Sequence, residues 1–311
     1  MTASATEVPS PLLSLSNALA DAVERAGRSV VAVNARQRAP SSGVHWRPGV
    51  IVTADHTLER DEGITVTLPN GQKLAASVTG RDPGTDLAVL KFEGADLPAA
   101  EIADSTELKV GHIVLAVARP GDHGLSASWG AVSAISGSWR TWTGGQIDQL
   151  VRIDLTLYPG FSGGPLVDAR GRVAGINTSG LSRSTSLAIP TATVNRVTEQ
   201  LLSKGRISRG YLGLGLQAVR LPDSLKTSLE LPSDGGLIVV SVEKGGPGEN
   251  AGILVGDILV ALEGTSVSDS DAVQGVLGPD SVGKNVTLLL VRGGQRTELP
   301  VTVGERPQRG A

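Results

Sequence analysis

The sequence contains no cysteine, only four histidines and few aromatic residues, which make up 3% of the chain. Without cysteine, disulfides, thiolate catalysis and cysteine-based zinc sites are excluded. No two of the histidines have the spacing of a helical zinc motif. We therefore expect neither a metal nor another cofactor.

Blocks of like charge and long apolar runs are also missing. The formal net charge is −3, and phosphate binding needs clustered Lys and Arg, so nucleic acid is not an expected partner. No apolar run reaches the roughly 18 residues of a membrane span. The N-terminal residues lack a charged segment followed by an unbroken apolar stretch, so no secretory signal is predicted. As written, the sequence indicates a cytoplasmic protein, or a periplasmic or secreted one if a leader has been removed.

The apolar pattern predicts two folded units with a helical segment before them. Apolar residues recur at helical spacing over 11–26, and short β-rich runs then follow one another to about residue 178, separated by Gly, Pro, Asn and Asp. Such runs are typical of an all-β sandwich or barrel. A helix is predicted over 191–204. From Gly210 onward, five further strands and two short helical segments, 247–252 and 270–277, indicate a small α+β module.

The pentapeptide GFSGG, residues 160–164, contains the candidate nucleophile Ser162. A glycine-rich turn exposes a serine side chain and directs backbone N–H groups at an oxyanion. A turn with no catalytic role could have the same sequence. The pattern also fits the nucleophile elbow of α/β-hydrolases, in which the histidine follows the serine. No histidine follows Ser162 here, so its base must lie upstream, in the His–Asp–Ser order of chymotrypsin-like enzymes.

Among the histidines, His56 is the candidate base because it follows the apolar strand VIVTA, where a side chain is both held and open to substrate. His112 opens the strand HIVLAVA and is read as a strand-edge residue. His45 and His123 lie in segments with glycine and proline, which predicts surface positions for both.

Two aspartates in RDPGTDLAVLKF are candidates for the acid that orients His56. Asp86 directly precedes an apolar strand, so its carboxylate could be buried beside an imidazole. Asp82 precedes a proline and is typical of a turn. The alternative interpretation is that Asp86 is only a turn residue at the start of the strand.

These segments together resemble HtrA/Deg-type serine proteases. TADHTL, TDLAVLKF and YPGFSGGPLVD match the His, Asp and Ser blocks in order, and RVAGINTSG and SLAIPTATV resemble the strands after the nucleophile. The PDZ domain of that family is matched by RGYLGLGLQ, AGILVGDILVALEGTSV and VRGGQRTELPVTVGERP. The resemblance covers nearly all of 28–306.

It implies a mainly β protein with a chymotrypsin-like double β-barrel followed by an α+β PDZ domain. The expected divisions are an N-terminal helical segment (1–27), a trypsin-like protease domain (28–205), a PDZ domain (209–306) and a tail (307–311).

The resemblance also assigns roles to residues. His56 would be the general base, Asp86 its orienting acid and Ser162 the nucleophile, with oxyanion donors at Gly160 and Ser162 and a further contribution from Phe161. The specificity pocket would be formed by Thr156, six residues before the nucleophile, and by Leu157, Ile176, Leu187 and Ile189. No acidic residue stands at its base, so we expect small or medium apolar side chains before the cleaved bond. The PDZ loop Tyr211, Leu212, Gly213 and Leu214 would bind a peptide carboxylate.

The implied function is ATP-independent serine endopeptidase activity in protein quality control, with unfolded polypeptides and C-terminal peptides as partners. Three departures stand against the family pattern: Phe161 replaces the usual Asn, ARPGDHG replaces a GNPFG-like loop, and residues before Trp46 lack the aromatics of family trimers. The helix over 11–26 could replace those aromatics in a homotrimer or larger assembly. A proteolytically silent chaperone or PDZ scaffold is the alternative function.

Overall fold

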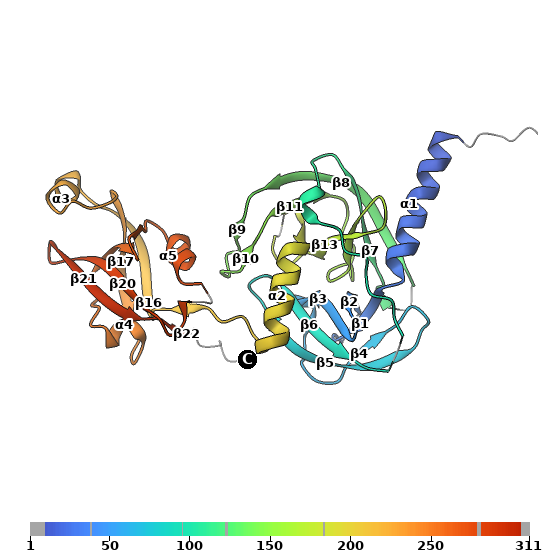
Figure 1. The fold of residues 1–311 in the computed structure, drawn as a ribbon, viewed down its shortest axis with the longest axis horizontal. Helices are drawn as coiled ribbons and strands as arrows, with labels where there is room; N and C mark the ends of the chain where they lie inside the picture. The colour runs from blue at the N-terminus through green and yellow to red at the C-terminus, as the bar shows by residue number, and fades with distance from the viewer. Residues whose placement is uncertain are drawn as a thin grey trace, which may run out of the picture. The chain divides into compact units, whose positions relative to one another are not determined.

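The structure is a computed structural model that describes residues 10–37, 39–94, 96–121, 124–182, 184–278 and 281–305. The chain divides into two compact units between Ile207 and Ser208 (Figure 1). His123 and the predicted tail 307–311 lie outside the described residues.

The first unit begins with helix α1 (Pro11–Gly27), as its apolar periodicity predicts. Proline at the first helical turn costs no hydrogen bond because that N–H has no partner within a helix. The C-terminal part of α1 packs on the barrels through Ala22 and Ala26, whereas Leu12, Leu13 and Leu15 are exposed. Figure 1 shows the N-terminal end of α1 projecting from the barrels.

Two closed antiparallel barrels follow, so the predicted chymotrypsin-like fold is confirmed. The first, in the order β1-β2-β3-β6-β5-β4, contains β1 (Val30–Asn34), β2 (Ser41–Arg47), β3 (Val50–Ala54), β4 (Ile64–Thr67), β5 (Lys73–Asp82) and β6 (Leu87–Phe92). The second, in the order β11-β14-β13-β12-β7-β8, contains β7 (Ile113–Ala118), β8 (Ser126–Ser136), β11 (Leu150–Asp154), β12 (Pro165–Asp168), β13 (Val173–Thr178) and β14 (Ser186–Pro190).

Smaller elements complete this unit. They are the 3-10 turns η1 (Asp55–Thr57) and η2 (Ser105–Glu107), the hairpin β9 (Trp139–Arg140) and β10 (Gln146–Ile147), and helix α2 (Thr191–Lys204). Helix α2 packs its apolar face against β5, β6 and β13. The helix has the predicted bounds and ends at Gly205, whose φ of 71° is the left-handed conformation that glycine adopts readily.

Strand β2 is not predicted from the apolar pattern of the sequence. The segment SSGVHWR has no clear apolar alternation, yet all of it except Arg47 is buried in the first barrel. The Ser41 and Ser42 hydroxyls have hydrogen-bond partners, which removes the cost of burying them. The surface position predicted for His45 is wrong, because its ring is 3% exposed and packs edge-on against Phe92.

The second unit is an α+β module with its own apolar core. Its main sheet has the order β16-β17-β18-β20-β21, with β16 at one edge. Its elements are β15 (Gly210–Tyr211), β16 (Leu214–Arg220), α3 (Asp223–Ser228), β17 (Gly235–Val242), α4 (Pro247–Asn250), β18 (Ile258–Leu262), β19 (Thr265–Ser266), α5 (Ser270–Val276), β20 (Asn285–Arg292), β21 (Gln295–Thr302) and β22 (Gly304–Glu305).

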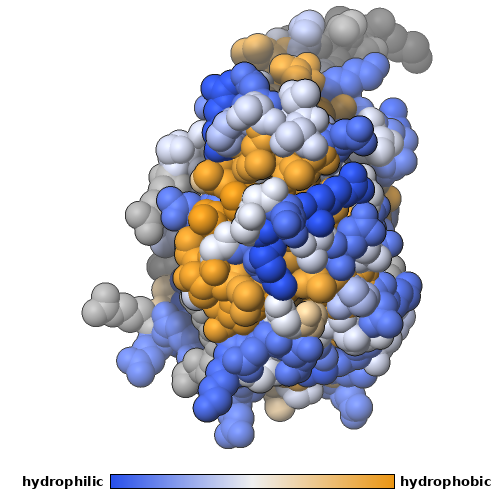
Figure 2. Space-filling model, turned by 90° about the vertical axis from the view of Figure 1, so that its left-hand side faces the viewer, coloured by the Kyte–Doolittle hydropathy of each residue, from blue (hydrophilic) through white to orange (hydrophobic). Residues whose placement is uncertain are grey.

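Figure 2 shows patches of apolar surface on this unit between hydrophilic side chains. Across the described parts of both units, none of the helices has the length and apolar character that crossing a membrane requires.

Candidate active site

The first pair of site residues joins two loops of the first barrel. His56 lies in the 3-10 turn after β3, and Asp86 lies directly before β6. Asp86 Oδ2 is 2.8 Å from His56 Nδ1, and Asp86 Oδ1 accepts a hydrogen bond from the His56 amide at 2.8 Å. The Thr178 hydroxyl donates to Asp86 Oδ2. Because the carboxylate accepts at Nδ1, the ring proton belongs there and Nε2 is left as the acceptor.

Local backbone geometry makes this pairing possible. Asp86 has φ 57°, a left-handed conformation that aspartate tolerates better than most non-glycine residues. Its side chain is 5% exposed, whereas that of His56 is 33% exposed. The acid is therefore enclosed while the imidazole is open to a substrate. Asp82, the alternative acid, instead accepts from the Gly84 amide and the Thr85 hydroxyl, as expected of a turn residue.

Ser162 lies in a tight turn between Gly160 (φ 87°) and Gly163 (φ 85°). The Gly160–Phe161 peptide is held at both ends: the Ser42 hydroxyl donates to the Gly160 carbonyl at 2.7 Å, and the Phe161 amide donates to the Tyr158 carbonyl at 3.0 Å. Among the described residues, the Gly160 and Ser162 amides donate to no protein group. Two unengaged N–H donors, those of Gly160 and of Ser162 itself, thus lie at the candidate nucleophile, whereas the amide of Phe161 is already engaged.

The Ser162 hydroxyl has a neighbour that the sequence did not single out. Ser162 Oγ lies 3.1 Å from Ser179 Oγ and accepts from the Ser179 amide at 3.3 Å, while Ser179 Oγ lies 3.5 Å from His56 Nε2. No direct hydrogen bond joins Ser162 to His56 in this part of the structure. The only signal for Ser179 was its place in RVAGINTSG, the segment matched to the strand after the nucleophile.

The Phe161 ring points away from the cleft. It is 2% exposed and packs in the second barrel with Ala116 and Ala118, with Tyr158 at 5.5 Å in an edge-on contact. The large side chain before the nucleophile is therefore a core residue of the turn and does not narrow the path to Ser162.

The residues predicted for the specificity pocket have different environments. Thr156 is exposed and its carbonyl accepts from the Ser128 hydroxyl. Leu157 packs against Phe161. Ile176 and Ile189, at 0% and 1% exposure, are members of the barrel core, and Leu187 is 6% exposed.

In the second unit, the predicted carboxylate loop lies between β15 and β16. Leu212 is buried in the core of the unit, and Gly213 has φ 71°. In the described part of the unit, the Leu212 and Gly213 amides donate to no protein group. Leu214 opens β16, which is an edge of the sheet, and an edge strand can accept an added peptide strand.

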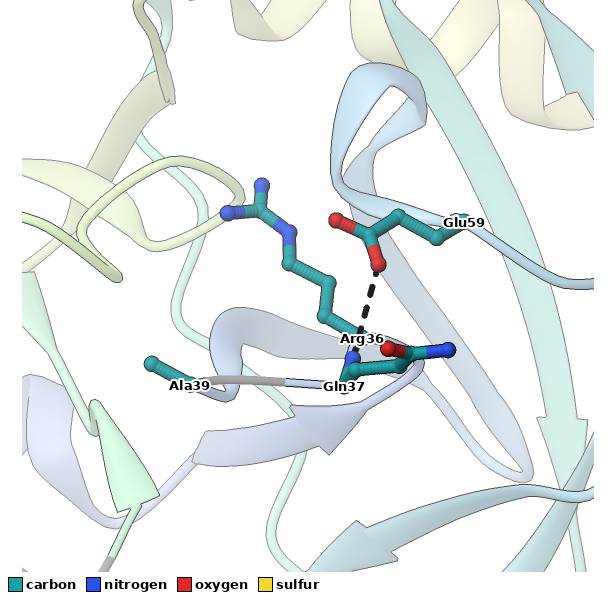
Figure 3. Close-up of a pocket in the computed structure, with 4 residues that line it drawn as sticks. All are labelled: Arg36, Gln37, Ala39 and Glu59. Atoms are coloured by element: carbon teal, nitrogen blue, oxygen red, sulfur yellow. Dashed lines mark hydrogen bonds between the residues drawn. The ribbon is translucent and has the colours of Figure 1, made fainter.

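A cavity of about 340 Å³ lies next to the turn that carries His56. Figure 3 shows its four lining residues. The Glu59 carboxylate accepts a hydrogen bond from the backbone N–H of Gln37, and the Arg36 side chain extends beside Glu59. Arg36 Nε donates to the Thr57 carbonyl at 3.0 Å, which connects this cavity to the turn that carries His56.

Known proteins resemble the chain in both units. The family described as "Trypsin-like peptidase domain" matches residues 41–176, and that described as "PDZ domain" matches 210–303. A "Probable periplasmic serine endoprotease DegP-like" of Chlamydia trachomatis serovar D is 36% identical over 265 residues, or 83% of this chain and 52% of the relative. A protein of the same name from Pseudomonas putida W619 is 34% identical over 268 residues, or 85% and 55%. The chain thus spans about half the length of these relatives.

Two solved structures match almost the whole chain. The serine endoprotease from Yersinia pestis has 30% identity and a TM-score of 0.77, with 97% of this chain and all of that one covered. The HtrA-type protease AlgW with a decapeptide has 29% identity and a TM-score of 0.76, with 93% and 99% covered.

Proposed function

Because the chain belongs to the HtrA/DegP-like serine proteases, with a trypsin-like domain followed by one PDZ domain, we propose that it is a serine endopeptidase. The observation that supports this most strongly is the His56–Asp86 pair beside Ser162, a serine in a glycine turn with two unengaged N–H donors. Base, orienting acid, nucleophile and oxyanion donors are the parts that acyl transfer requires.

In the proposed reaction, Ser162 Oγ attacks the scissile carbonyl carbon and its proton passes to His56 Nε2. This step requires the Ser162 hydroxyl to turn from Ser179 to His56. The Gly160 and Ser162 amides stabilise the oxyanion, and Asp86 stabilises the imidazolium. His56 then donates the proton to the leaving amine as the C–N bond breaks. Water hydrolyses the remaining acyl ester, again with His56 accepting the proton.

The substrates proposed are unfolded or damaged polypeptides, cleaved without ATP in protein quality control. Thr156, Leu157 and Leu187 would favour a small or medium apolar side chain before the cleaved bond, because none of them carries a charge. The free amides of Leu212 and Gly213 would bind a C-terminal carboxylate, and the peptide would extend the sheet at β16. The AlgW structure with a decapeptide supports peptide binding.

A periplasmic location and a homotrimer complete the proposal. The location follows the names of the DegP-like relatives. The trimer is supported by the exposed leucines of α1, which leave an apolar surface for other chains to cover.

The test is Ser162→Ala. We expect it to abolish casein and model-peptide cleavage and to prevent labelling by a fluorophosphonate probe, because the variant lacks the hydroxyl that carries out the attack in the proposed reaction. Ser182→Ala removes the hydroxyl of a half-buried serine in the loop before β14. It is the control and should leave both unchanged.

A proteolytically silent chaperone or scaffold is the second candidate, and the missing direct Ser162–His56 hydrogen bond favours it. Wild-type protein that neither cleaves nor reacts with the probe would support that candidate and reject the protease.

A further inference from the structure

The turn that carries His56 is held by an arginine from another strand. Arg81, in the last part of β5, donates through Nε to Asp55 Oδ1 at 2.6 Å and through Nη2 to the carbonyls of Asp55 and Leu58 at 3.2 and 3.0 Å. Its Nη1 donates to Asp61 Oδ1 at 2.8 Å. Asp55 and Leu58 bracket η1, so one guanidinium bridges both ends of the segment that contains His56.

The turn also has restraints from within the first barrel: the Thr57 hydroxyl donates to the Ala54 carbonyl at 2.7 Å and accepts from the Ser41 hydroxyl at 3.0 Å. Ala54, the N-cap of the turn, makes no side-chain capping hydrogen bond. At the other end, the Leu58 N–H donates to the Asp55 carbonyl. The His56 side chain is 33% exposed, so packing restrains it only in part. The contacts of Asp86, Thr57 and Arg36 each hold one part of the turn, whereas the Arg81 guanidinium binds the carbonyls of both Asp55 and Leu58.

Arg81 itself has a fixed backbone. It forms a parallel β-bridge with Arg206, which follows α2. The preceding residue, Gly80, approaches Gly205 so closely that a Cβ there would lie 2.4 Å from the Gly205 carbonyl oxygen. Only glycine permits that approach, so β5 is fastened to the end of α2 directly before the arginine.

The buried carboxylate of Asp55 also needs the positive charge of Arg81 as a partner. The Asp55 side chain is 8% exposed. Burial raises the pKa of its carboxyl, whereas the Arg81 hydrogen bond and charge lower it, and the charge of Asp86 raises it. Without Arg81, a buried carboxylate would remain unpaired one residue from His56, which is costly.

We propose that Arg81 is a positioning residue, which holds the η1 backbone so that His56 stays aligned with Asp86 and can reach Ser162. The inference rests on the proposed peptidase function and adds a residue to its machinery. Exposed ion pairs contribute little to stability. The distinguishing feature of Arg81 is that its fork binds two backbone carbonyls of the catalytic turn as well as two carboxylates.

The chain supplies a matched control in Arg172. Its side chain is 28% exposed, against 29% for Arg81, and it also bridges two carboxylates, those of Asp168 and Glu107. None of its hydrogen-bond partners belongs to the catalytic turn. Arg172→Gln thus removes the same charge and its bonds to two carboxylates without touching η1.

The experiment compares Arg81→Gln, Arg81→Lys and Arg172→Gln in the full chain, with kcat and KM for a model peptide, the Tm, and histidine-ring NMR. We expect Arg81→Gln to lower kcat by about tenfold to a hundredfold, the range for a small misplacement of a catalytic group, with KM nearly unchanged. Arg81→Lys should be intermediate, since it keeps the charge but not the fork. Arg172→Gln should resemble wild type. Equal kcat in Arg81→Gln and Arg172→Gln would overturn the proposal.

NMR separates this inference from the function on which it rests. The chain has four histidines, so the ring signals of His56 can be assigned by replacing each in turn. Arg81→Gln should shift the His56 signals and Arg172→Gln should not, whether or not the wild type cleaves peptides. Unchanged His56 signals in Arg81→Gln would reject the positioning role. Wild-type protein that behaves like Ser162→Ala would reject the peptidase. If Arg81→Gln is unfolded at the assay temperature, Arg81→Lys carries the same comparison.

Discussion

At the scale of single residues, Ser42 holds the Gly160–Phe161 peptide beside Ser162. It is fully buried, its hydroxyl donates to the Gly160 carbonyl, and the same oxygen accepts the Arg119 amide at 2.9 Å. Its own amide donates to the Ser162 carbonyl at 3.3 Å. The Gly160–Phe161 peptide, which lies between the unengaged amides of Gly160 and Ser162, is therefore held by a hydroxyl from the other barrel.

We predict that Ser42→Ala lowers kcat by about tenfold to a hundredfold, since the peptide between the two proposed oxyanion donors loses a hydrogen bond that holds it. Stability should fall by about 1–3 kcal/mol, because a carbonyl and an amide lose their partner. The measurements are peptide kinetics and urea unfolding. Ser29→Ala is the control: that hydroxyl is also buried and donates to a carbonyl, that of Ala26, away from the site. A loss of stability in Ser42→Ala without a loss of kcat relative to Ser29→Ala would contradict the prediction.

Residue identity could be predicted from the sequence only where a local motif marks it. His56, Asp86 and Ser162 each lie in a recognisable block, and the structure brings the first two into contact. Ser42, Arg81 and Ser179 make contacts across the fold. Their bonds to Gly160, Asp55 and His56 span 118, 26 and 123 positions of the chain, respectively. The sequence around each of these residues does not predict such contacts, because each contact depends on how the strands close into barrels.

At the scale of elements, apolar periodicity located α2 and most strands but not β2. Strands with Val, Ile and Leu in succession, such as β3 and β7, are buried and easily predicted. Strand β2 is equally buried but polar in composition, and it becomes a strand because its neighbours β1 and β3 pair with both of its edges. Tertiary pairing here overrides a weak local signal.

An ion pair joins two strands of the second unit. Asp257 precedes β18, and Arg292, at the end of β20, donates to both of its carboxylate oxygens at 2.8 and 2.6 Å. The Asp257 side chain is 2% exposed. The Arg292 hydrogen bond lowers the pKa of the Asp257 carboxyl below its usual 3.8, and burial acts in the opposite direction.

We predict that Asp257→Asn destabilises the second unit at pH 7 by on the order of 2 kcal/mol, less than for a fully enclosed pair because Arg292 is 32% exposed. A lowered folded-state pKa means that this stabilisation is complete above pH 3.8 and is lost as the pH falls through the folded value. The difference between wild type and Asp257→Asn should therefore shrink at more acidic pH.

Urea unfolding at a series of pH values provides the measurement. All four tryptophans lie in the first unit, so their fluorescence follows that unit, whereas circular dichroism reports on both. Asp234→Asn is the control, since its pair with Arg220 is exposed and 3.7 Å long. If both variants unfold alike at pH 7, the Asp257 pair does not stabilise the sheet.

At the scale of the whole molecule, the two units have separate cores and separate tasks in the proposed function. The barrels carry the His56, Asp86 and Ser162 side chains, and the second unit offers the edge strand β16 for a peptide. Each unit closes its own apolar core, which is the kind of feature that local apolar patterns can indicate. Local apolar patterns do not predict how chains assemble, since assembly depends on surfaces formed only in the folded protein.

The last prediction concerns α1. Leu12, Leu13 and Leu15 are 78%, 53% and 45% exposed, an unusual concentration on one helix, and burying each leucine contributes about 1.5–3 kcal/mol. In a trimer these side chains would be covered by other copies. We expect light scattering to give three times the chain mass for the wild type and the mass of one chain when all three leucines are replaced by serine. Replacing Leu254 and Val255, which are exposed to a similar degree on the second unit, should leave the trimer intact. A wild-type monomer, or a trimer that survives loss of the three leucines, would show that α1 does not hold the chains together.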